Sequence, residues 1–215
     1  MADPPKQKAE GGRELDRIVF FSDAVFAIAI TLLVLNIEVP EIPEDLVAQE
    51  LPGRLLDLWP KLLSYVISFL VILTYWMAHH SIFSIIRSYD RGLIWLNSLF
   101  LMCVAFLPFP SALFGEYGDQ QLVVAIYAGS LGITRLLLTA VWWYASSGHR
   151  LVNSDLDPAV IRAFLIRGLA IPLVFFISVA ISFFSVSVAI YSWLLLVVFD
   201  FLRLRVLRRH GENSN

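Results

Sequence analysis

The chain has 215 residues, of which 58% are hydrophobic and only 16% are charged, and its mean hydropathy is +0.74. Soluble domains carry about 25% charged residues, so this chain has too little polar surface to coat a water-soluble particle. The net charge of −2 is spread over separate segments, so it indicates no charged partner, and we expect lipid rather than nucleic acid around the protein. The lone cysteine, Cys103, excludes an intrachain disulfide.

Four apolar segments in the first two thirds of the chain are long enough to cross a bilayer. The hydrocarbon core is about 30 Å thick and needs roughly 20 mostly apolar residues in a helix. Spanning helices are therefore predicted at 18–37, 58–86, 92–114 and 120–145. Pro108 and Pro110 should loosen the last turns of the third helix. The 38–57 linker between the first two is acidic and rich in proline.

The last apolar segment is too long for a single transmembrane helix. No charged residue lies between Leu169 and Phe199. A single helix over 163–201 would be well over about 50 Å long at 1.5 Å per residue, which is too long even with strong tilt. Serines replace large aliphatic residues around 182–187, so we predict a break there, between a fifth helix at 163–182 and a sixth at 187–202.

Basic and acidic residues alternate between the predicted loops. Six helices place the clusters around Arg17, Arg87, Arg162 and Arg208 on one side, while the acidic linker lies on the other. The positive-inside rule identifies the basic side as cytoplasmic. The predicted fold class is thus an all-α, multi-pass protein of the cell membrane with both termini in the cytoplasm. Its single membrane domain covers 17–209, between a disordered tail at 1–16 and a short tail at 210–215.

A few ionisable or amide side chains fall inside the predicted helices: Asp23, His79, His80, Asn97, Arg135 and Asp200. Counted from the nearest arginine, Asp23, the two histidines and Asn97 all lie about 9–12 Å inside the cytoplasmic edge. One shared polar layer is typical of hydrogen bonds that hold helices together, although a role in moving ions or protons is also open. A metal site is disfavoured, because adjacent histidines point about 100° apart on a helix. Asp23 should find its partner on another helix.

The first helix has an aliphatic stripe. Ile28, Leu32 and Leu35 share one face, with Thr31 beside them, and by pattern alone such a stripe is typical of a surface facing lipid or the core. The chain has no phosphate-binding loop, nucleophile elbow or metalloprotease helix, so we expect no enzyme. A potassium filter of the Thr-Val-Gly-Tyr-Gly type is also missing from the sequence.

One motif in the first helix is specific. The run Arg17-Ile-Val-Phe-Phe-Ser-Asp23 resembles the Arg-x-x-x-Phe-Ser-Asp signature of the transmembrane protein 175 family of potassium channels, and the residues that follow, up to Leu35, are similar to that family's first helix. Trp76-Met-Ala-His-His80, Trp95-Leu-Asn97 and Leu107-Pro-Phe109 add to the likeness. A single unit of this length resembles the prokaryotic members.

The resemblance implies a homotetramer in which the first helix of each subunit lines a central pore. It implies a hydrophobic pore constriction at Ile28, Leu32 and Leu35, with Thr31 contributing to selectivity. It also implies a structural polar network, whose expected members are Arg17, Phe21, Ser22, Asp23, Asn97 and either His79 or His80. No cofactor is expected beyond the permeant potassium ion.

A potassium-preferring cation channel is therefore the leading hypothesis. The alternative is an ion- or proton-coupled secondary transporter that uses Asp23, His79 and His80. Transporters commonly contain a pair of broken helices in corresponding halves, and we find no such pair in this sequence. A non-conducting scaffold or an enzyme is a third possibility, but the chain lacks a nucleophile or metal cluster.

Overall fold

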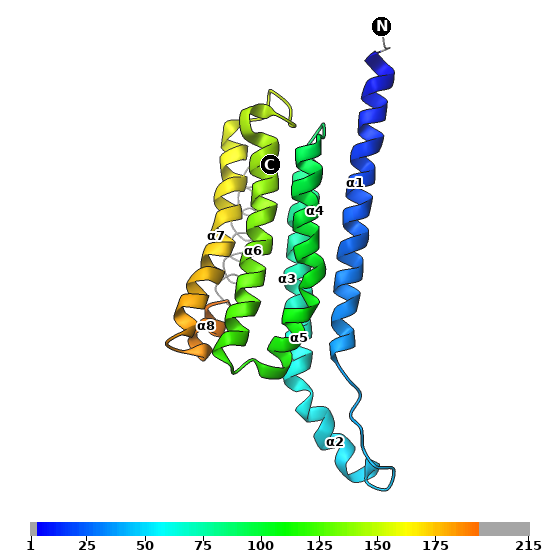
Figure 1. The fold of residues 1–215 in the computed structure, drawn as a ribbon, viewed down its shortest axis with the longest axis vertical. Coiled ribbons are helices and arrows are strands. Elements are labelled where there is room, and N and C mark those ends of the chain that lie inside the picture. Colours follow the sequence, from blue (N-terminus) through cyan, green and yellow to red (C-terminus); the bar gives the residue numbers. More distant parts are fainter. Residues whose placement is uncertain (1–3, 194–215) are drawn as a thin grey trace, which may run out of the picture.

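A computed structural model describes residues 4–193, with side chains from Arg13 onward. The regular elements of this part are helices: α1 (Pro4–Leu32), η1 (Leu33–Asn36), α2 (Val47–Asp57), α3 (Trp59–Phe83), α4 (Arg91–Phe106), α5 (Pro108–Tyr117), α6 (Gln121–Ser146), η2 (Ser147–His149), α7 (Pro158–Ser182) and α8 (Val186–Ser192). Figure 1 shows them as an upright bundle in which α6 and α7 lie at one edge, α3 and α4 in the middle, and α1 at the opposite edge.

Five helical segments are long and apolar enough to cross a membrane: Arg13–Asn36, Trp59–Phe83, Arg91–Tyr117, Gln121–His149 and Pro158–Ser182. They match the first five predicted spans closely. The predicted sixth helix, at 187–202, begins with α8, and the rest of it lies outside the described residues. The break before it falls where the serines indicated: α7 ends at Ser182, and Ser185 caps α8 by accepting a hydrogen bond from the backbone N–H of Val188 at 3.4 Å.

The first helix begins earlier than the sequence indicated. A disordered tail was expected up to Asp16, but α1 already begins at Pro4. The residues that precede the apolar segment include Lys, Gln, Ala, Glu and Arg, which favour helix, and an existing helix extends more easily than a new one nucleates. The apolar span thus provides the nucleus from which the polar residues continue the helix.

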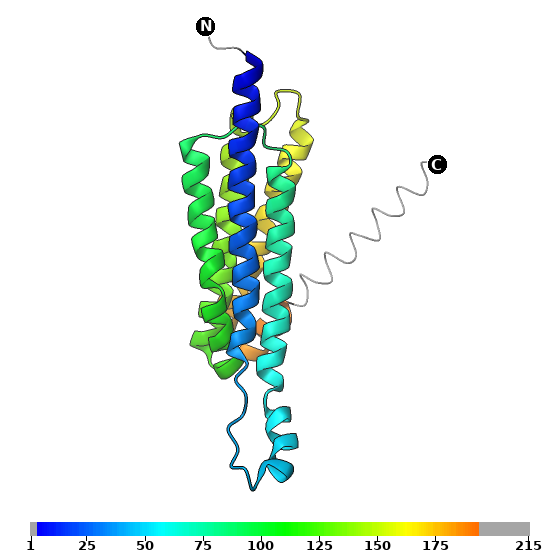
Figure 2. The same ribbon diagram turned by 90° about the vertical axis from the view of Figure 1, so that its right-hand side faces the viewer.

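The acidic linker contains a helix that the sequence analysis did not predict. Helix α2 occupies its second half, and none of the α2 residues is buried. Figures 1 and 2 show α2 and the linker extending beyond the other helices at one end of the bundle. We call this the linker end. The opposite end, where α3 and α6 end and α4 and α7 begin, is called the motif end.

Proline determines two helix boundaries. The third predicted span is divided at Leu107, because Pro108 and Pro110 remove backbone N–H donors and α5 restarts with Pro108 in its first turn. Helix α7 likewise begins at Pro158, where Asp157 caps the helix by accepting from the Ala159 N–H at 2.7 Å. The fifth helix therefore begins five residues earlier than the predicted start at 163.

Helices α6 and α7 pack closely through small residues. A Cβ atom on Gly168 of α7 would lie 2.6 Å from the Thr139 hydroxyl of α6, and one on Gly132 of α6 would lie 3.0 Å from the Phe176 ring of α7. Close approach at small residues is the usual means of joining helices in lipid, where the hydrophobic effect gives no drive for association. Helix α6 has more buried residues than the other described helices, 13 of them between Val124 and Ser146.

A polar clasp joins α4 to α6 at the motif end. Asp90 caps α4 through the Leu93 N–H (2.8 Å), accepts from the Tyr144 hydroxyl (2.8 Å) and pairs with Arg150 (3.1 Å). Partial burial alone would raise the pKa of Asp90, but these hydrogen bonds and the nearby guanidinium together hold it below its ordinary value. Gly92 leaves the space that the Tyr144 ring occupies.

Candidate pore face and polar layer

Helix α1 is buried on one face only. Ser22, Phe26, Ala29 and Leu33 are each no more than 1% exposed, and they recur at helical spacing along the side that contacts α3 and α4. Figure 2 shows α1 seated between those two helices. The rest of the bundle lies on that side, so the opposite face of α1 is open within a single subunit.

The predicted constriction residues all lie on this open face. The exposed fraction is 59% for Ile28, 40% for Leu32 and 70% for Leu35. Thr31 is exposed beside them, and its hydroxyl donates to the Ile28 carbonyl at 2.9 Å. The hydroxyl hydrogen is thus used within the helix, and the oxygen lone pairs remain available outward. We call Ile28, Thr31, Leu32 and Leu35 the pore face.

The buried face of α1 carries a hydrogen-bonded group that joins three helices. The Ser22 hydroxyl donates to the Ile18 carbonyl (2.8 Å) and accepts from Asn97 Nδ2 of α4 (3.0 Å). Asn97 Oδ1 lies 3.1 Å from Nε2 of His79 on α3. Because an amide oxygen only accepts, the His79 proton sits on Nε2. Its Nδ1 is buried and has no hydrogen-bond partner among the described residues. We call Ser22, His79 and Asn97 the polar layer.

Aromatic rings enclose the His79 side chain. Phe83 stacks on the imidazole with centroids 4.2 Å apart, Phe100 stacks at 5.7 Å, and Phe26 of α1 lies tilted at 5.7 Å. His80, one position along α3, is exposed and stacks on Trp76 at 5.7 Å instead. The structure thus places His79, not His80, in contact with Asn97.

Asp23 has a partner on another helix, but the partner is not a histidine. Its Oδ1 accepts from the indole Nε1 of Trp76 on α3 at 2.8 Å. In the sequence, Trp76 stands out only as part of the motif Trp76-Met-Ala-His-His80. A tryptophan one turn before His80 was the available signal, because the indole N–H is a donor that needs an acceptor when it is partly buried.

Two of the expected network residues lie outside these contacts. Arg17 is exposed and pairs with Glu14 of its own helix at 2.8 Å, and Phe21 is 62% exposed. Both lie on the first helix near the motif end, and within the described part of the chain they make no hydrogen bond or ring contact with His79 or Asn97. Their roles in the network therefore remain predictions.

Sequence reasoning missed a second polar group nearer the linker end. Ser111 of α5 donates its hydroxyl to Ser68 of α3 at 2.6 Å, and Ser68 shares a 2.8 Å hydrogen bond with the Tyr127 hydroxyl of α6. Ser64 donates to the Ser111 carbonyl at 2.8 Å. The spacing of Ser64 and Ser68, one turn apart in an apolar helix, was the only signal. We call Ser64, Ser68, Ser111 and Tyr127 the hydroxyl cluster.

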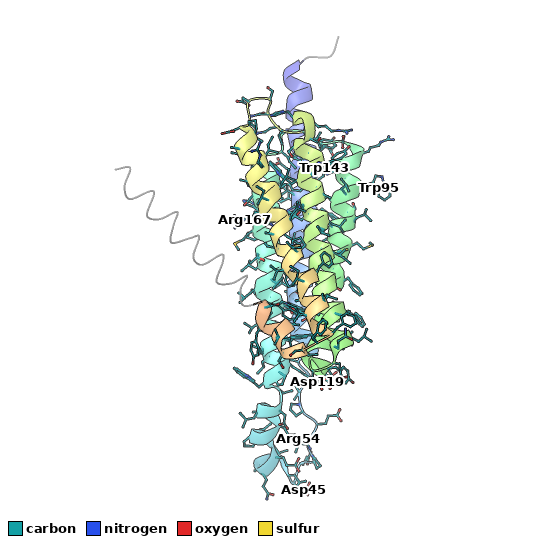
Figure 3. All side chains as sticks on the ribbon, turned by 90° about the vertical axis from the view of Figure 1, so that its left-hand side faces the viewer. Asp45, Arg54, Trp95, Asp119, Trp143 and Arg167 are labelled. Carbon is teal, nitrogen blue, oxygen red and sulfur yellow. The ribbon has the colours of Figure 1, made fainter. Side chains whose placement is uncertain are left out.

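The described residues contain no group of three or more His, Cys, Asp or Glu side chains that could hold a metal ion. Two tryptophans near the motif end, Trp95 and Trp143, are exposed, and Trp95 projects outward in Figure 3. Such a position is typical of aromatic side chains at the boundary between hydrocarbon and water.

Fold and site together define a helical multi-pass membrane protein whose first helix keeps one face open. Residues 17–108 match the family model described as endosomal/lysosomal potassium channel TMEM175. A potassium channel of Chamaesiphon minutus is 35% identical over 206 residues, covering 94% of this chain and 98% of the relative. The endosomal/lysosomal proton channel TMEM175 of Bos taurus is 30% identical over 210 residues, covering 90% of this chain and 44% of the relative.

A solved structure agrees with these sequence relatives. The crystal structure of a lysosomal potassium-selective channel TMEM175 homolog from Chamaesiphon minutus superposes with a TM-score of 0.77 at 34% identity, covering 89% of this chain and 98% of the other. The chain belongs to the TMEM175 family of ion channels, so the family predicted from the first-helix motif is confirmed. These relatives are channels and not enzymes.

Proposed function

We propose that this chain forms a homotetrameric, potassium-preferring cation channel in which four copies of α1 surround a central pore. Family membership supports a channel, and the name of the 35% identical bacterial relative supports potassium as the ion. Bacterial relatives are named potassium channels and animal relatives proton channels, and this chain covers nearly the whole length of the bacterial protein but less than half of the bovine one.

The observation that carries this proposal is the open face of α1. Three large aliphatic side chains of α1 and η1 are exposed, away from the buried face of this segment. Helix α1 stands at the edge of the bundle that lies opposite α6 and α7 (Figure 1). In a fourfold assembly around this edge, the open faces of four α1 helices meet at the axis. The other sides of each α1 helix then contact the rest of its own subunit and the two neighbouring subunits.

The chemistry of the pore face suits a hydrophobic constriction. From Ile28 to Leu35 it extends about 10 Å along the helix. Aliphatic rings offer no ligands to replace an ion's water, so a narrow ring blocks conduction by dewetting and a wider one passes hydrated ions. Potassium holds its water less tightly than sodium, which favours potassium in a tight, wet neck. Thr31 adds hydroxyl oxygens that strengthen this preference.

The polar layer and Asp23 have a structural role in this proposal. The hydrogen bonds of Ser22 and Asp23 lead away from the pore face, to α3 and α4. They fix the rotation of α1 about its own axis, and this rotation decides which side chains meet the pore. A proton- or ion-coupled transporter using Asp23 and the histidines is not favoured, because the relatives are channels.

The proposed topology has six spans, both termini in the cytoplasm and the motif end facing the cytoplasm. The membrane domain then covers residues 17–209 in a multi-pass protein of the cell membrane, followed by a short tail at 210–215. The clasp of Asp90 and Arg150 and the exposed Arg87 and Arg91 lie at the motif end, in agreement with the positive-inside rule.

Reversal potentials in liposome-derived bilayers test the pore face. Ile28→Asn should wet the neck, raise the current and lower the preference for potassium over sodium. Thr31→Ala should lower the preference with a smaller effect on current. Ile177→Asn provides a matched control, because Ile177 is 48% exposed on α7, at the edge of the bundle opposite α1. If both pore-face variants keep the wild-type reversal potential, α1 does not line the pore.

Labelling of single cysteines tests the topology. In a Cys103→Ser background, Glu44→Cys in the linker should react with an impermeant maleimide from outside intact cells, and His210→Cys should react only after the membrane is opened. Labelling of position 210 from outside would contradict the predicted sixth span.

A further inference from the structure

The first membrane-spanning segment changes its geometry at the linker end. Helix α1 ends at Leu32, and η1 (Leu33–Asn36) continues as a 3₁₀ helix, after which the backbone of Ile37 is extended. A 3₁₀ helix has 3.0 residues per turn against 3.6 in an α-helix, so each residue of η1 turns the chain by about 120° rather than about 100°. Leu35 belongs to η1, and its direction therefore depends on this short segment as well as on the rotation of α1.

The polar layer is too distant to hold η1. Asn36 follows Ser22 by fourteen residues, which corresponds to about 20 Å along the helix axis. The 3₁₀ segment closes with a hydrogen bond from the Ile37 N–H to the Val34 carbonyl at 3.1 Å, and bonds of this type have poorer geometry than those of an α-helix. The orientation of η1 therefore depends on contacts of its own with the rest of the bundle.

Two side chains of η1 make such contacts. Leu33 is 0% exposed, and Asn36 is half-buried, with its Nδ2 donating to the Pro108 carbonyl of α5 at 3.2 Å. Val34 and Leu35, between them, are exposed. Apolar packing such as that of Leu33 has no directional preference, whereas a hydrogen bond weakens steeply when its donor is misaligned. Asn36 thus supplies a directional contact between η1 and its neighbours.

The acceptor of this hydrogen bond belongs to a helix that is itself tied down. Figure 1 shows α5 beside the linker end of α1, and α5 contacts η1 directly. One turn after Pro108, the Ser111 carbonyl accepts from Ser64 at 2.8 Å, and the Ser111 hydroxyl donates to Ser68 at 2.6 Å. Both partner serines lie on α3. The hydroxyl cluster therefore joins α5 to α3, and Asn36 connects η1 to this pair of helices.

We propose that Asn36 is a positioning residue of the pore: its hydrogen bond to the Pro108 carbonyl holds η1 in the orientation that keeps Leu35 on the pore face. The inference rests on the pore face proposed above. The polar layer then sets the rotation of the segment near the motif end, and Asn36 sets it at the linker end. Loss of the Asn36 donor frees η1 to turn, so the residue at position 35 spends less time directed at the axis.

A small cavity beside Asn36 separates this positioning role from stability. Its volume is about 10 Å³, room for about one water molecule, and its walls include the hydroxyls of Ser64 and Tyr65 and the ammonium group of Lys61. In an Asn36→Ala variant, the space of the lost amide joins this polar cavity, and water entering there takes over as donor to the Pro108 carbonyl. The variant should therefore unfold at nearly the wild-type temperature, although the directional link to α5 is gone.

The rate of cysteine modification at position 35 tests the proposal. In a Cys103→Ser background, Leu35→Cys should react with a cationic methanethiosulfonate reagent added from the linker end, and the reaction should block the current. Asn36→Ala and the similarly shaped Asn36→Leu should each slow this block about twofold to tenfold, the change in population that one net hydrogen bond produces. Gln49→Ala is the matched control, because Gln49 is an exposed amide on α2, and it should keep the wild-type rate.

Ile28→Cys, treated with the same reagent from the motif end, provides a control within the same segment. Helix α1 and the polar layer hold position 28, so its rate of block should not change in the Asn36 variants. An unchanged rate at position 35, or equal changes at positions 28 and 35, would overturn the positioning role and leave the pore face standing. If modification of Leu35→Cys blocks no current in any background, the pore face itself is wrong and the inference falls with it.

Discussion

The polar layer and the hydroxyl cluster join helices by different means. In the layer, an amide and an imidazole have fixed donors and acceptors, so the direction of each hydrogen bond between α1, α3 and α4 is set. In the cluster, hydroxyls that can rotate link α3, α5 and α6. The layer therefore specifies one orientation of α1, whereas the cluster tolerates small adjustments. We expect the two to differ in their response to the loss of one member.

The largest effect is expected from Asn97→Leu. It leaves the His79 Nε2–H without its acceptor and Ser22 without its donor, at about 1–3 kcal/mol for each buried group left unpaired. Thermal unfolding of the protein in detergent measures the loss. Ser98→Leu is the control, because Ser98 is exposed on the same helix. Equal stability of the two variants would show that the layer does not hold α1.

Asp23→Ala should have the next largest effect, on assembly more than on selectivity. The Trp76 indole loses its acceptor, and α1 loses its direct hydrogen bond to α3. Asp23→Asn keeps a carbonyl oxygen at the same position and should restore most of the tetramer on size-exclusion chromatography. Stable tetramers of the alanine variant with an altered reversal potential would instead identify Asp23 as part of a filter.

A smaller effect, about 0.5–1.5 kcal/mol, is expected from Tyr127→Phe. The Ser68 hydroxyl loses one partner but keeps its hydrogen bond with Ser111, so no member of the cluster becomes isolated. Unfolding in detergent again provides the measurement, with Tyr117→Phe on the exposed end of α5 as the control. A loss as large as that of Asn97→Leu would remove the distinction between the two groups.

The smallest effect on subunit stability is expected from Arg17→Gln. Arg17 is exposed and bound only to Glu14 within its helix, and exposed ion pairs contribute about 0–1 kcal/mol. The same exposure leaves Arg17 available to a neighbouring subunit. If the variant loses the tetramer while the unfolding temperature of the subunit is unchanged, Arg17 of the motif acts in the contact between subunits. A large fall in subunit stability would place it within the polar layer after all.

The amino-acid sequence by itself determined the five described spans, the break after Ser182 and the family. These depend on local properties: the length of apolar runs, proline and serine positions, and a motif within one helix. The sequence also placed Asp23, Asn97 and the histidines at one depth, because the helical rise converts residue number into depth.

Only the tertiary structure decided which of those side chains meet. His79 and His80 are the same residue type and lie at nearly the same depth in the span, but the rotation of α3 about its axis buries the first and exposes the second. Helix rotation likewise decides that Trp76 donates to Asp23. It also brings Ser68, Ser111 and Tyr127 together from three helices. Rotation about a helix axis is set by packing against neighbours, and a single sequence without its neighbours in space does not contain that information.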